Sequence, residues 1–150
     1  MQLSDFFSPD AICLELRGGS KDEILAELVR LLGLDDGAGD TLLRMLLRRE
    51  ALGSTGVGRG IAIPHCRAPM VGRLRLAYGH HREGVEFQAI DNLPAHDFFL
   101  IVAPPLEISN QYLPVLGKIA QFAKEDDVPG RLAALRSPEE FFRLLEEKGV

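Results

Sequence analysis

RREALGSTGVGRGIAIPHC, at residues 48–66, is the stretch that decides how the rest of this chain is interpreted. It has the composition of a helix end, a loop with four glycines, a short apolar strand, and a proline followed by a histidine. Because glycine lacks a Cβ, the backbone N–H groups of such a loop can converge on one point. Ser54 and Thr55 add hydroxyl donors, and Arg49 adds a fixed positive charge. The stretch therefore predicts an anion site, with His65 beside it as nucleophile or base.

This glycine loop differs from the loops that bind nucleotides. A Walker loop ends in Gly-Lys-Ser/Thr and connects a strand to a helix, whereas residues 48–66 contain no lysine and run from helix to loop to strand. The dinucleotide fingerprint likewise needs a preceding strand and a following helix N-terminus. Arg59 adds a second positive charge to the loop. We therefore expect a phosphoryl group carried by His65 itself rather than the phosphates of a nucleotide.

Two motifs resemble those of a known family. Residues 53–65 resemble the active-site signature of EIIA domains of the bacterial phosphoenolpyruvate:sugar phosphotransferase system. The likeness is to the fructose/mannitol type, which includes a nitrogen-regulatory branch. Residues 85–94, VEFQAIDNLP, resemble a second motif of that family, and the resemblance extends from about Leu3 to Leu145. It identifies residues 1–150 as a single EIIA type-2 domain and implies a mixed sheet of about four or five strands.

Composition and charge restrict the class of protein. The chain has 150 residues, of which 46% are hydrophobic, and this suffices for the core of one domain. Its net charge of −5 argues against a nucleic-acid surface. No apolar run approaches the roughly 20 residues that cross a bilayer, and the N-terminus lacks the pattern of a signal peptide. Two cysteines, Cys13 and Cys66, make no disulfide framework. We expect a cytoplasmic protein without membrane insertion.

The spacing of apolar residues predicts strands that alternate with helices. Strands are expected at residues 12–16, 73–80 and 98–103; the last is apolar throughout, as in the centre of a sheet. Residues 80–84 are expected to form a turn. Such interleaving favours an α/β fold, in which helices cover both faces of a central sheet. The expected helices begin after Ser20, at Asp40 or Thr41, after Pro105, at Arg131 and after Ser137.

The resemblance also assigns roles to individual side chains. It implies that His65 is phosphorylated, and a neutral imidazole is an available nucleophile near pH 7. Phosphoryl transfer mainly requires alignment and compensation of the anionic oxygens. Arg49 would neutralise phosphoryl charge, while Ser54, Thr55 and the loop N–H groups would donate hydrogen bonds. No metal and no cofactor is expected, because positive charge is already supplied.

The chain departs from the family at one position. The family usually has a second histidine near the start of the long helix, facing the phosphorylated one, and the alignment puts Tyr112 there. A tyrosine hydroxyl can donate a hydrogen bond or orient the ring, but it carries no positive charge near pH 7. This departure favours a regulatory, nitrogen-type member over one devoted to sugar transport.

Three further features have both a functional and a structural interpretation. His80 and His81 suggest a metal, but neighbours on a strand point to opposite faces and cannot easily chelate one ion. Cys66 follows His65 directly, but adjacent side chains diverge, and a half-buried thiol is preferred over a nucleophile. Glu50 either bonds the loop, pairs with an arginine or lies in solvent at the helix end, and the sequence leaves these open.

The resemblance implies two kinds of partner. A phosphohistidine carrier such as HPr would dock over residues 53–65 and pass its phosphoryl group to His65. The protein would then pass it to a separate EIIB, or act on a sensor kinase or transporter according to its phosphorylation state. The alternative is a binding module that keeps the EIIA fold with weak or no phosphotransfer. A hydrolase using His65 and Cys66 lacks an evident third group to orient the base.

Overall fold

The computed structural model describes residues 1–107 and 109–150. A single mixed sheet has the strand order β1-β5-β6-β3-β2, and β4 also pairs with β6. The described strands are β1 (Phe7–Cys13), β2 (Gly56–Gly58), β3 (Ile61–Ala62), β4 (His65–Arg67), β5 (Arg75–Val85) and β6 (Ala95–Ala103). The described helices are a 3-10 turn (Leu3–Phe6), α1 (Lys21–Arg30), α2 (Asp36–Leu52), α3 (Tyr112–Ala123), α4 (Val128–Ala133) and α5 (Pro138–Glu147).

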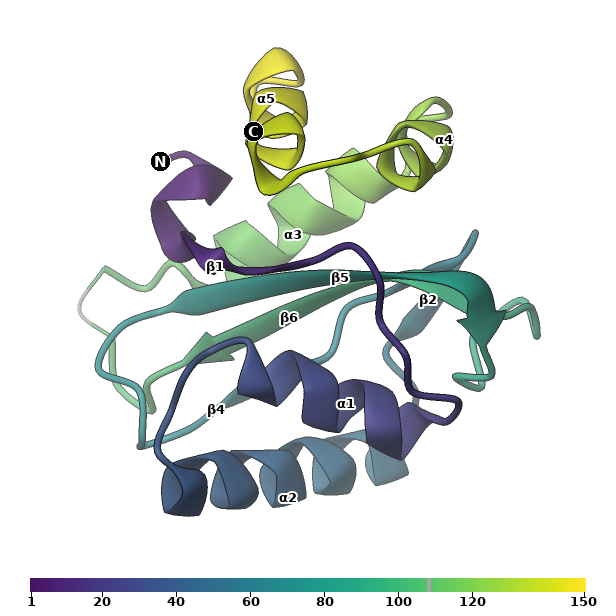
Figure 1. The fold of residues 1–150 in the computed structure, drawn as a ribbon. Coiled ribbons are helices and arrows are strands. Elements are labelled where there is room, and N and C mark those ends of the chain that lie inside the picture. Colours follow the sequence, from purple (N-terminus) through teal and green to yellow (C-terminus); the bar gives the residue numbers. More distant parts are fainter. Residues whose placement is uncertain (108) are drawn as a thin grey trace.

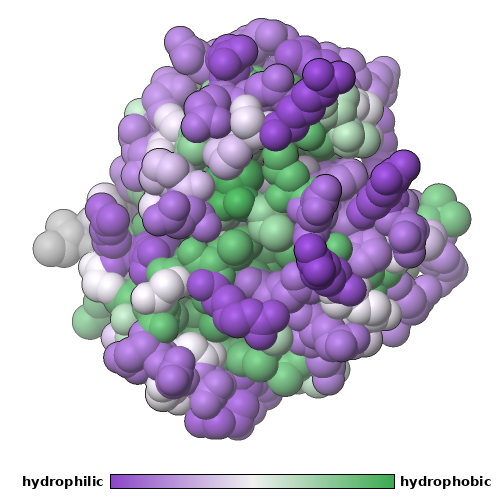
Figure 2. Space-filling view, viewed as in Figure 1, coloured by the Kyte–Doolittle hydropathy of each residue, from purple (hydrophilic) through white to green (hydrophobic). Residues whose placement is uncertain are grey.

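The helices form a layer on each face of the sheet. Figure 1 shows α1 and α2 below the sheet and α3, α4 and α5 above it. The expected α/β class with helices on both faces is therefore confirmed. Figure 2 shows hydrophobic residues gathered between the two helical layers, while hydrophilic residues spread over the outer helices. Within residues 1–107 and 109–150, no helix is both long enough and apolar enough to cross a bilayer.

The sheet has six strands in the part of the chain that the structure describes, where four or five were expected. The difference arises in the glycine-rich stretch, which forms β2 and β3 instead of a loop and one strand. Gly58 and Gly60 have φ values of 92° and 80°, in the left-handed region that glycine adopts without strain, and they let the chain reverse between the two strands. Pro64 separates β3 from β4, because proline has no N–H to continue a ladder.

Strand β6 lies at the centre, with β5 antiparallel on one side and β3 and β4 parallel on the other. Its side chains alternate between two buried clusters. Phe99 and Ile101 belong to the core beneath α3, α4 and α5, and Phe98 and Leu100 belong to the core against α1 and α2. The apolar run therefore does mark a central strand with both faces covered, as predicted.

Several element boundaries differ from the sequence-based expectation. Strand β5 continues through residues 80–84, which were expected to form a turn, and its register with β6 shifts between His80 and Val85. Helix α2 begins at Asp36, because the Asp35 side chain accepts a hydrogen bond from Ala38 N at 2.9 Å and caps it earlier than Asp40. Helix α4 begins at Val128, and strand β1 begins before Ile12.

The predicted starts of two other helices are confirmed. Ser20 caps α1, since its hydroxyl accepts from Glu23 N at 3.3 Å, and the Glu23 carboxylate accepts from Gly19 N at 3.1 Å. Ser137 caps α5 in the same way, by accepting from Glu140 N at 3.2 Å. These local signals are reliable because the cap bonds join residues only three or four positions apart.

Candidate functional site

His65 is the first residue of β4 and is half-buried. It pairs with Ile101 of β6, so its side chain lies on the sheet face that α3, α4 and α5 cover. Its Nδ1 is 2.7 Å from the carbonyl oxygen of Ile63. A carbonyl oxygen only accepts, so Nδ1 carries the proton and Nε2 of the neutral ring keeps a lone pair. The backbone therefore orients this imidazole so that Nε2 is the ring nitrogen with an available lone pair.

Two side chains lie next to this ring on the same face. Tyr112, the first residue of α3, has its ring centroid 6.1 Å from that of His65, with the two planes at 60°. Arg67 follows His65 by two positions in β4, and its guanidinium lies 4.5 Å from the centroid of the Tyr112 ring. This distance is typical of a cation–π contact. The predicted proximity of Tyr112 to His65 is thus present, and a cation that sequence reasoning missed stacks on the tyrosine.

Arg67 is held in place by groups at the start of α3. Its Nη1 donates to the carbonyl oxygen of Pro104 at 2.9 Å and lies 3.9 Å from Glu107 Oε1. The same carboxylate oxygen accepts from Tyr112 N at 2.8 Å. Glu107 therefore fixes both the arginine and the first turn of the helix that carries the tyrosine. The signal for Arg67 was its spacing from His65, since positions i and i+2 of a strand share a face.

The environment of Tyr112 keeps its hydroxyl protonated. Burial raises the pKa of Tyr112 to about 12, and the neighbouring Cys66 acts in the same direction. The charges of Arg67 and Arg49 oppose this rise in the pKa of Tyr112. Near pH 7 the side chain therefore carries a neutral hydroxyl, and Arg67 stacks on its ring.

The other predicted site residues hold the glycine-rich loop together. Arg49 Nη1 donates to Gly53 O at 2.8 Å, at the C-terminus of α2. The Ser54 hydroxyl donates to Phe87 O at 2.5 Å, and the buried Thr55 hydroxyl donates to Glu50. A hydroxyl has a single hydrogen, so Ser54 or Thr55 would have to leave its acceptor to reach a phosphoryl oxygen. None of these hydrogen bonds joins the three side chains to the ring of His65.

Glu50 is the central acceptor of this loop. It is 7% exposed, and its carboxylate accepts from Lys21 Nζ at 3.0 Å and from Thr55 N at 3.1 Å. Of the alternatives that the sequence left open, hydrogen bonding to the loop is confirmed. Lys21 was missed as a partner because it lies 29 positions away in α1. The carboxylate thus joins α1, α2 and the loop.

Arg59 lies far from the imidazole, although the sequence suggested that it adds charge to the same site. Its Nη1 donates to Lys124 O at 2.7 Å, and its Nη2 contacts Asp126 at 3.1 Å. Lys124 follows the last residue of α3, whereas Tyr112 is the first, and twelve residues of helix span about 18 Å. Arg59 therefore connects the β2–β3 turn to the far end of α3.

The Cys–His and metal interpretations gain no support from the geometry. Cys66 pairs with Val102 and packs with the core on the opposite sheet face from His65, and burial raises the pKa of its thiol to about 11. A protonated thiol is a poor nucleophile. His80 bonds Asp97, while His81 Nδ1 accepts from Gly84 N at 3.0 Å. Among residues 1–107 and 109–150, no three His, Cys, Asp or Glu side chains are grouped as metal ligands.

Almost the whole chain matches a known protein family. The family described as "Phosphoenolpyruvate-dependent sugar phosphotransferase system, EIIA 2" matches residues 5–148. The chain belongs to this family. The resemblance inferred from residues 53–65 and 85–94 is thereby confirmed, and with it a phosphocarrier or regulatory EIIA role.

Individual relatives include both branches of the family. The "Nitrogen regulatory protein" of Bradyrhizobium diazoefficiens is 30% identical over 149 residues, which are 97% of this chain and 95% of that protein. The crystal structure of nitrogen regulatory protein IIA-Ntr from Neisseria meningitidis has a TM-score of 0.86 and 30% identity, and the match covers 95% of this chain and 98% of that one. The enzyme IIAMTL of Escherichia coli, solved in complex with phosphorylated enzyme IIBMTL, shares the fold with a TM-score of 0.75 and 22% identity, over 94% of this chain and 99% of that chain.

Proposed function

We propose that this EIIA protein accepts a phosphoryl group on Nε2 of His65. The observation that carries the proposal is the 2.7 Å contact of His65 Nδ1 with the Ile63 carbonyl, which holds the proton on Nδ1 and keeps the lone pair on Nε2. In the transfer, that lone pair forms the new N–P bond while the N–P bond of the donor breaks, and the donor imidazole takes the electron pair. The backbone carbonyl stabilises the N–H that remains on the ring.

Two arginines balance the charge of the phosphoryl group. A phosphoryl group carries about −1.5 to −2 charges near pH 7. Arg67 in β4 stacks on Tyr112 beside the imidazole, and Arg49 at the end of α2 carries a second positive charge. Tyr112 has no charge to add, so its part is to hold Arg67 by stacking and to offer its hydroxyl. Ser54 and Thr55 add donors only if their present bonds open.

The donor that suits this site is an HPr-type phosphocarrier in the cytoplasm, docking over residues 53–65. Residues 1–150 act as a single EIIA type-2 domain in this proposal. The acceptor is an EIIB domain, by analogy with the E. coli IIAMTL–IIBMTL complex, or the phosphorylation state itself signals to a sensor kinase or transporter. The two 30% identical relatives described above carry nitrogen-regulatory names, and Tyr112 differs from the usual histidine, so we favour the signalling role.

A phosphorylation assay tests this function. The full chain is incubated with phosphoenolpyruvate and the general carriers of the phosphotransferase system, and the acid-labile phosphate is mapped. We expect one phosphate on His65, and a reduction of more than about 100-fold in His65→Gln, because the nucleophile is lost. The matched control, His96→Gln, should keep the label. Absence of label on the wild-type chain would instead support the alternative, a regulator that binds partners without phosphotransfer.

A further inference from the structure

An acidic residue lies inside the mostly apolar central strand. Asp97 is 2% exposed and directly precedes Phe98 in β6. Burying a carboxylate is unfavourable, and replacing buried ionic groups with apolar ones is often neutral or stabilising. Apolar side chains in place of the whole Tyr78, Asp97 and His80 cluster would therefore be compatible with the fold, whereas removal of Asp97 alone leaves its two partners without an acceptor. A function for the buried carboxylate would explain its presence.

The hydrogen bonds of Asp97 leave one of its oxygens available. Tyr78 donates its hydroxyl to Asp97 Oδ1 at 2.6 Å, and His80 Nδ1 lies 2.7 Å from the same oxygen. The Asp97 side chain is 4% exposed, and among the described residues Oδ2 has no side-chain donor. In the described part of the chain, every side-chain oxygen that is fully enclosed has a hydrogen-bond partner. Oδ2 of Asp97 has none, so it is not fully enclosed, and it opens onto the cavity that Asp97 lines. This gives the cavity a buried acceptor beside an oriented imidazole.

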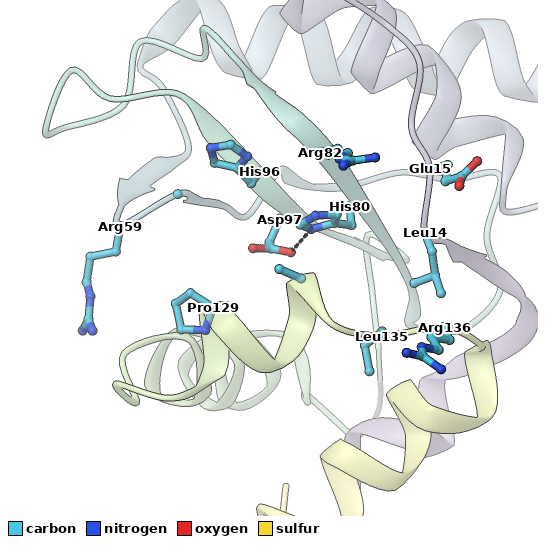
Figure 3. A pocket seen from close by; sticks show the side chains of 12 residues that line it. Leu14, Glu15, Arg59, His80, Arg82, His96, Asp97, Pro129, Leu135 and Arg136 are labelled. Atoms are coloured by element: carbon cyan, nitrogen blue, oxygen red, sulfur yellow. Dashed lines mark hydrogen bonds and ion pairs between the residues drawn. The ribbon is translucent and has the colours of Figure 1, made fainter.

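The cavity lies at the opposite end of α3 from His65. Its volume is about 830 Å³, within the range of small-molecule sites. Figure 3 shows Asp97 and His80 in the middle of its wall, with Arg59 on one side and Arg82 and Arg136 on the other. Asp97 precedes Ile101, the partner of His65, by four positions, which is about 13 Å along the strand. The cavity is therefore separate from the phosphorylation site.

Positive charge is in excess around this cavity, although the chain carries a net charge of −5. Three arginines line it, against the carboxylates Glu15 and Asp97. Arg59 already contacts Asp126, but within residues 1–107 and 109–150 neither Arg82 nor Arg136 forms an ion pair. Guanidinium groups bind carboxylate and phosphate in bidentate geometry. The arginines that line the cavity thus favour a ligand with an anionic group, and the buried acceptor Asp97 Oδ2 favours a hydrogen-bond donor on the same ligand.

We propose that this cavity binds a small organic anion. Its phosphate or carboxylate group contacts Arg82 and Arg136, and a hydroxyl or ammonium group on the same molecule donates to Asp97 Oδ2. The buried Tyr78–Asp97–His80 cluster keeps this acceptor rigid before the ligand arrives. An EIIA protein with such a site would respond to a metabolite as well as to its own phosphorylation.

Calorimetric titration of the full-length protein tests the site with two pairs of probes. Glycerol 3-phosphate and methyl phosphate share the phosphate, but only the first has hydroxyl donors. L-glutamate and glutarate share the carboxylates, but only the first has an ammonium group. We expect the donor-bearing member of one pair to bind with a dissociation constant below about 1 mM, and its partner at least about tenfold more weakly. The pair that responds identifies the anionic group.

Variants locate the binding. The double variant Arg82→Gln/Arg136→Gln changes only exposed side chains, and it should weaken the bound probe by at least about tenfold. Arg44→Gln, on α2 at the other sheet face, is the matched control and should leave the affinity unchanged. The proposal is overturned if neither donor-bearing probe binds at about 10 mM, if each pair binds equally, or if the double variant keeps the affinity.

Discussion

His65 and His80 lie on the same face of one sheet, and each holds Nδ1 2.7 Å from an oxygen. The oxygen beside His65 belongs to the main-chain carbonyl of Ile63, whereas that beside His80 belongs to the buried carboxylate of Asp97. The hydrogen bond to a main-chain carbonyl orients the first ring, while Tyr112 and the Arg67 that stacks on it lie nearby. A bond to a carboxylate ties the second ring into the protein interior. The two histidines share a sheet face and differ in the partner of Nδ1. This partner, rather than the face, decides that His65 is a candidate nucleophile and that His80 belongs to a buried cluster.

The largest stability effect is expected where the carboxylate is removed. Asp97→Ala leaves the Tyr78 hydroxyl and His80 Nδ1 without their acceptor in a buried site, which should lower the free energy of unfolding by about 3 kcal/mol. His65→Ala removes a half-buried ring and should lower it by less than about 1 kcal/mol. Urea unfolding of both variants measures the difference. Equal losses of unfolding free energy for the two variants would contradict this difference between the surroundings of His65 and His80.

The loop beside His65 depends on a carboxylate of its own. Glu50→Ala removes the acceptor of Lys21 and of Thr55, so we expect a loss of about 2 kcal/mol in unfolding free energy. Glu146→Ala, an exposed glutamate on α5, is the control and should change stability by less than about 0.5 kcal/mol. Thermal unfolding followed by circular dichroism measures both. A Glu50 variant as stable as the control would show that other contacts hold the loop.

Replacing Arg67 tests the arginine that sequence reasoning missed. Arg67→Gln should slow phosphorylation of His65 about tenfold, which corresponds to about 1.4 kcal/mol, because one of two compensating charges is lost. Arg67→Lys keeps the charge but loses the planar stacking on Tyr112, so its rate should be intermediate. Arg143→Gln on α5 should be unaffected. Rates of label incorporation at a fixed carrier concentration measure these effects, and wild-type rates for Arg67→Gln would remove Arg67 from the site.

The two tyrosines extend the comparison to alkaline pH. Burial raises the pKa of Tyr112 to about 12, while burial and Asp97 raise that of Tyr78 well above its ordinary value. In the folded state both tyrosines favour the protonated form. Their contribution to the free energy of unfolding is therefore complete below pH 10 and is lost as the pH rises above it. For the partly exposed Tyr112 we expect a loss of about 1 kcal/mol by pH 12.

Tyrosinate absorbance follows the ionisation of the two tyrosines without overlap from tryptophan, which the chain lacks, and the two steps differ in pH. Tyr112 should ionise in the folded protein, and Tyr78 only when the protein unfolds. In the variant Tyr112→Phe, the ionisation step that occurs in the folded protein should disappear. A single step in the wild-type protein at ordinary tyrosine pH would contradict the burial of both rings.

Local signals in the sequence were enough for the helix caps and the central strand. Ser20 and Ser137 bond groups three positions away, and the apolar run of β6 needs no partner to be recognised. Contacts between distant residues were not predictable in this way. Lys21 meets Glu50 only after α1 and α2 pack together, and the Arg67–Tyr112 stack depends on how β4 faces α3.

The predicted strand count and the predicted turn at residues 80–84 differ from the structure for a related reason, which is that strand pairing depends on distant residues. Short strands such as Gly56–Gly58 exist because neighbouring strands pair with them, and their own residues have low strand propensity. The role of His65 was suggested by the motif, whereas the orientation of its ring follows from a backbone carbonyl that no pattern of side chains reveals.

The attachment of Arg59 to the end of α3 has a consequence for proteolysis. Exposed glycine-rich segments are preferred sites of cleavage, and a protease specific for arginine would act after Arg59. Here that residue has a φ of 59° in a tight turn, and its guanidinium is bonded to Lys124 O and Asp126. A protease needs an extended chain and an available side chain, so digestion at this bond must wait until the turn extends and Arg59 leaves Lys124 and Asp126. The rate of cleavage there would therefore report how often the β2–β3 turn detaches from the segment that follows α3.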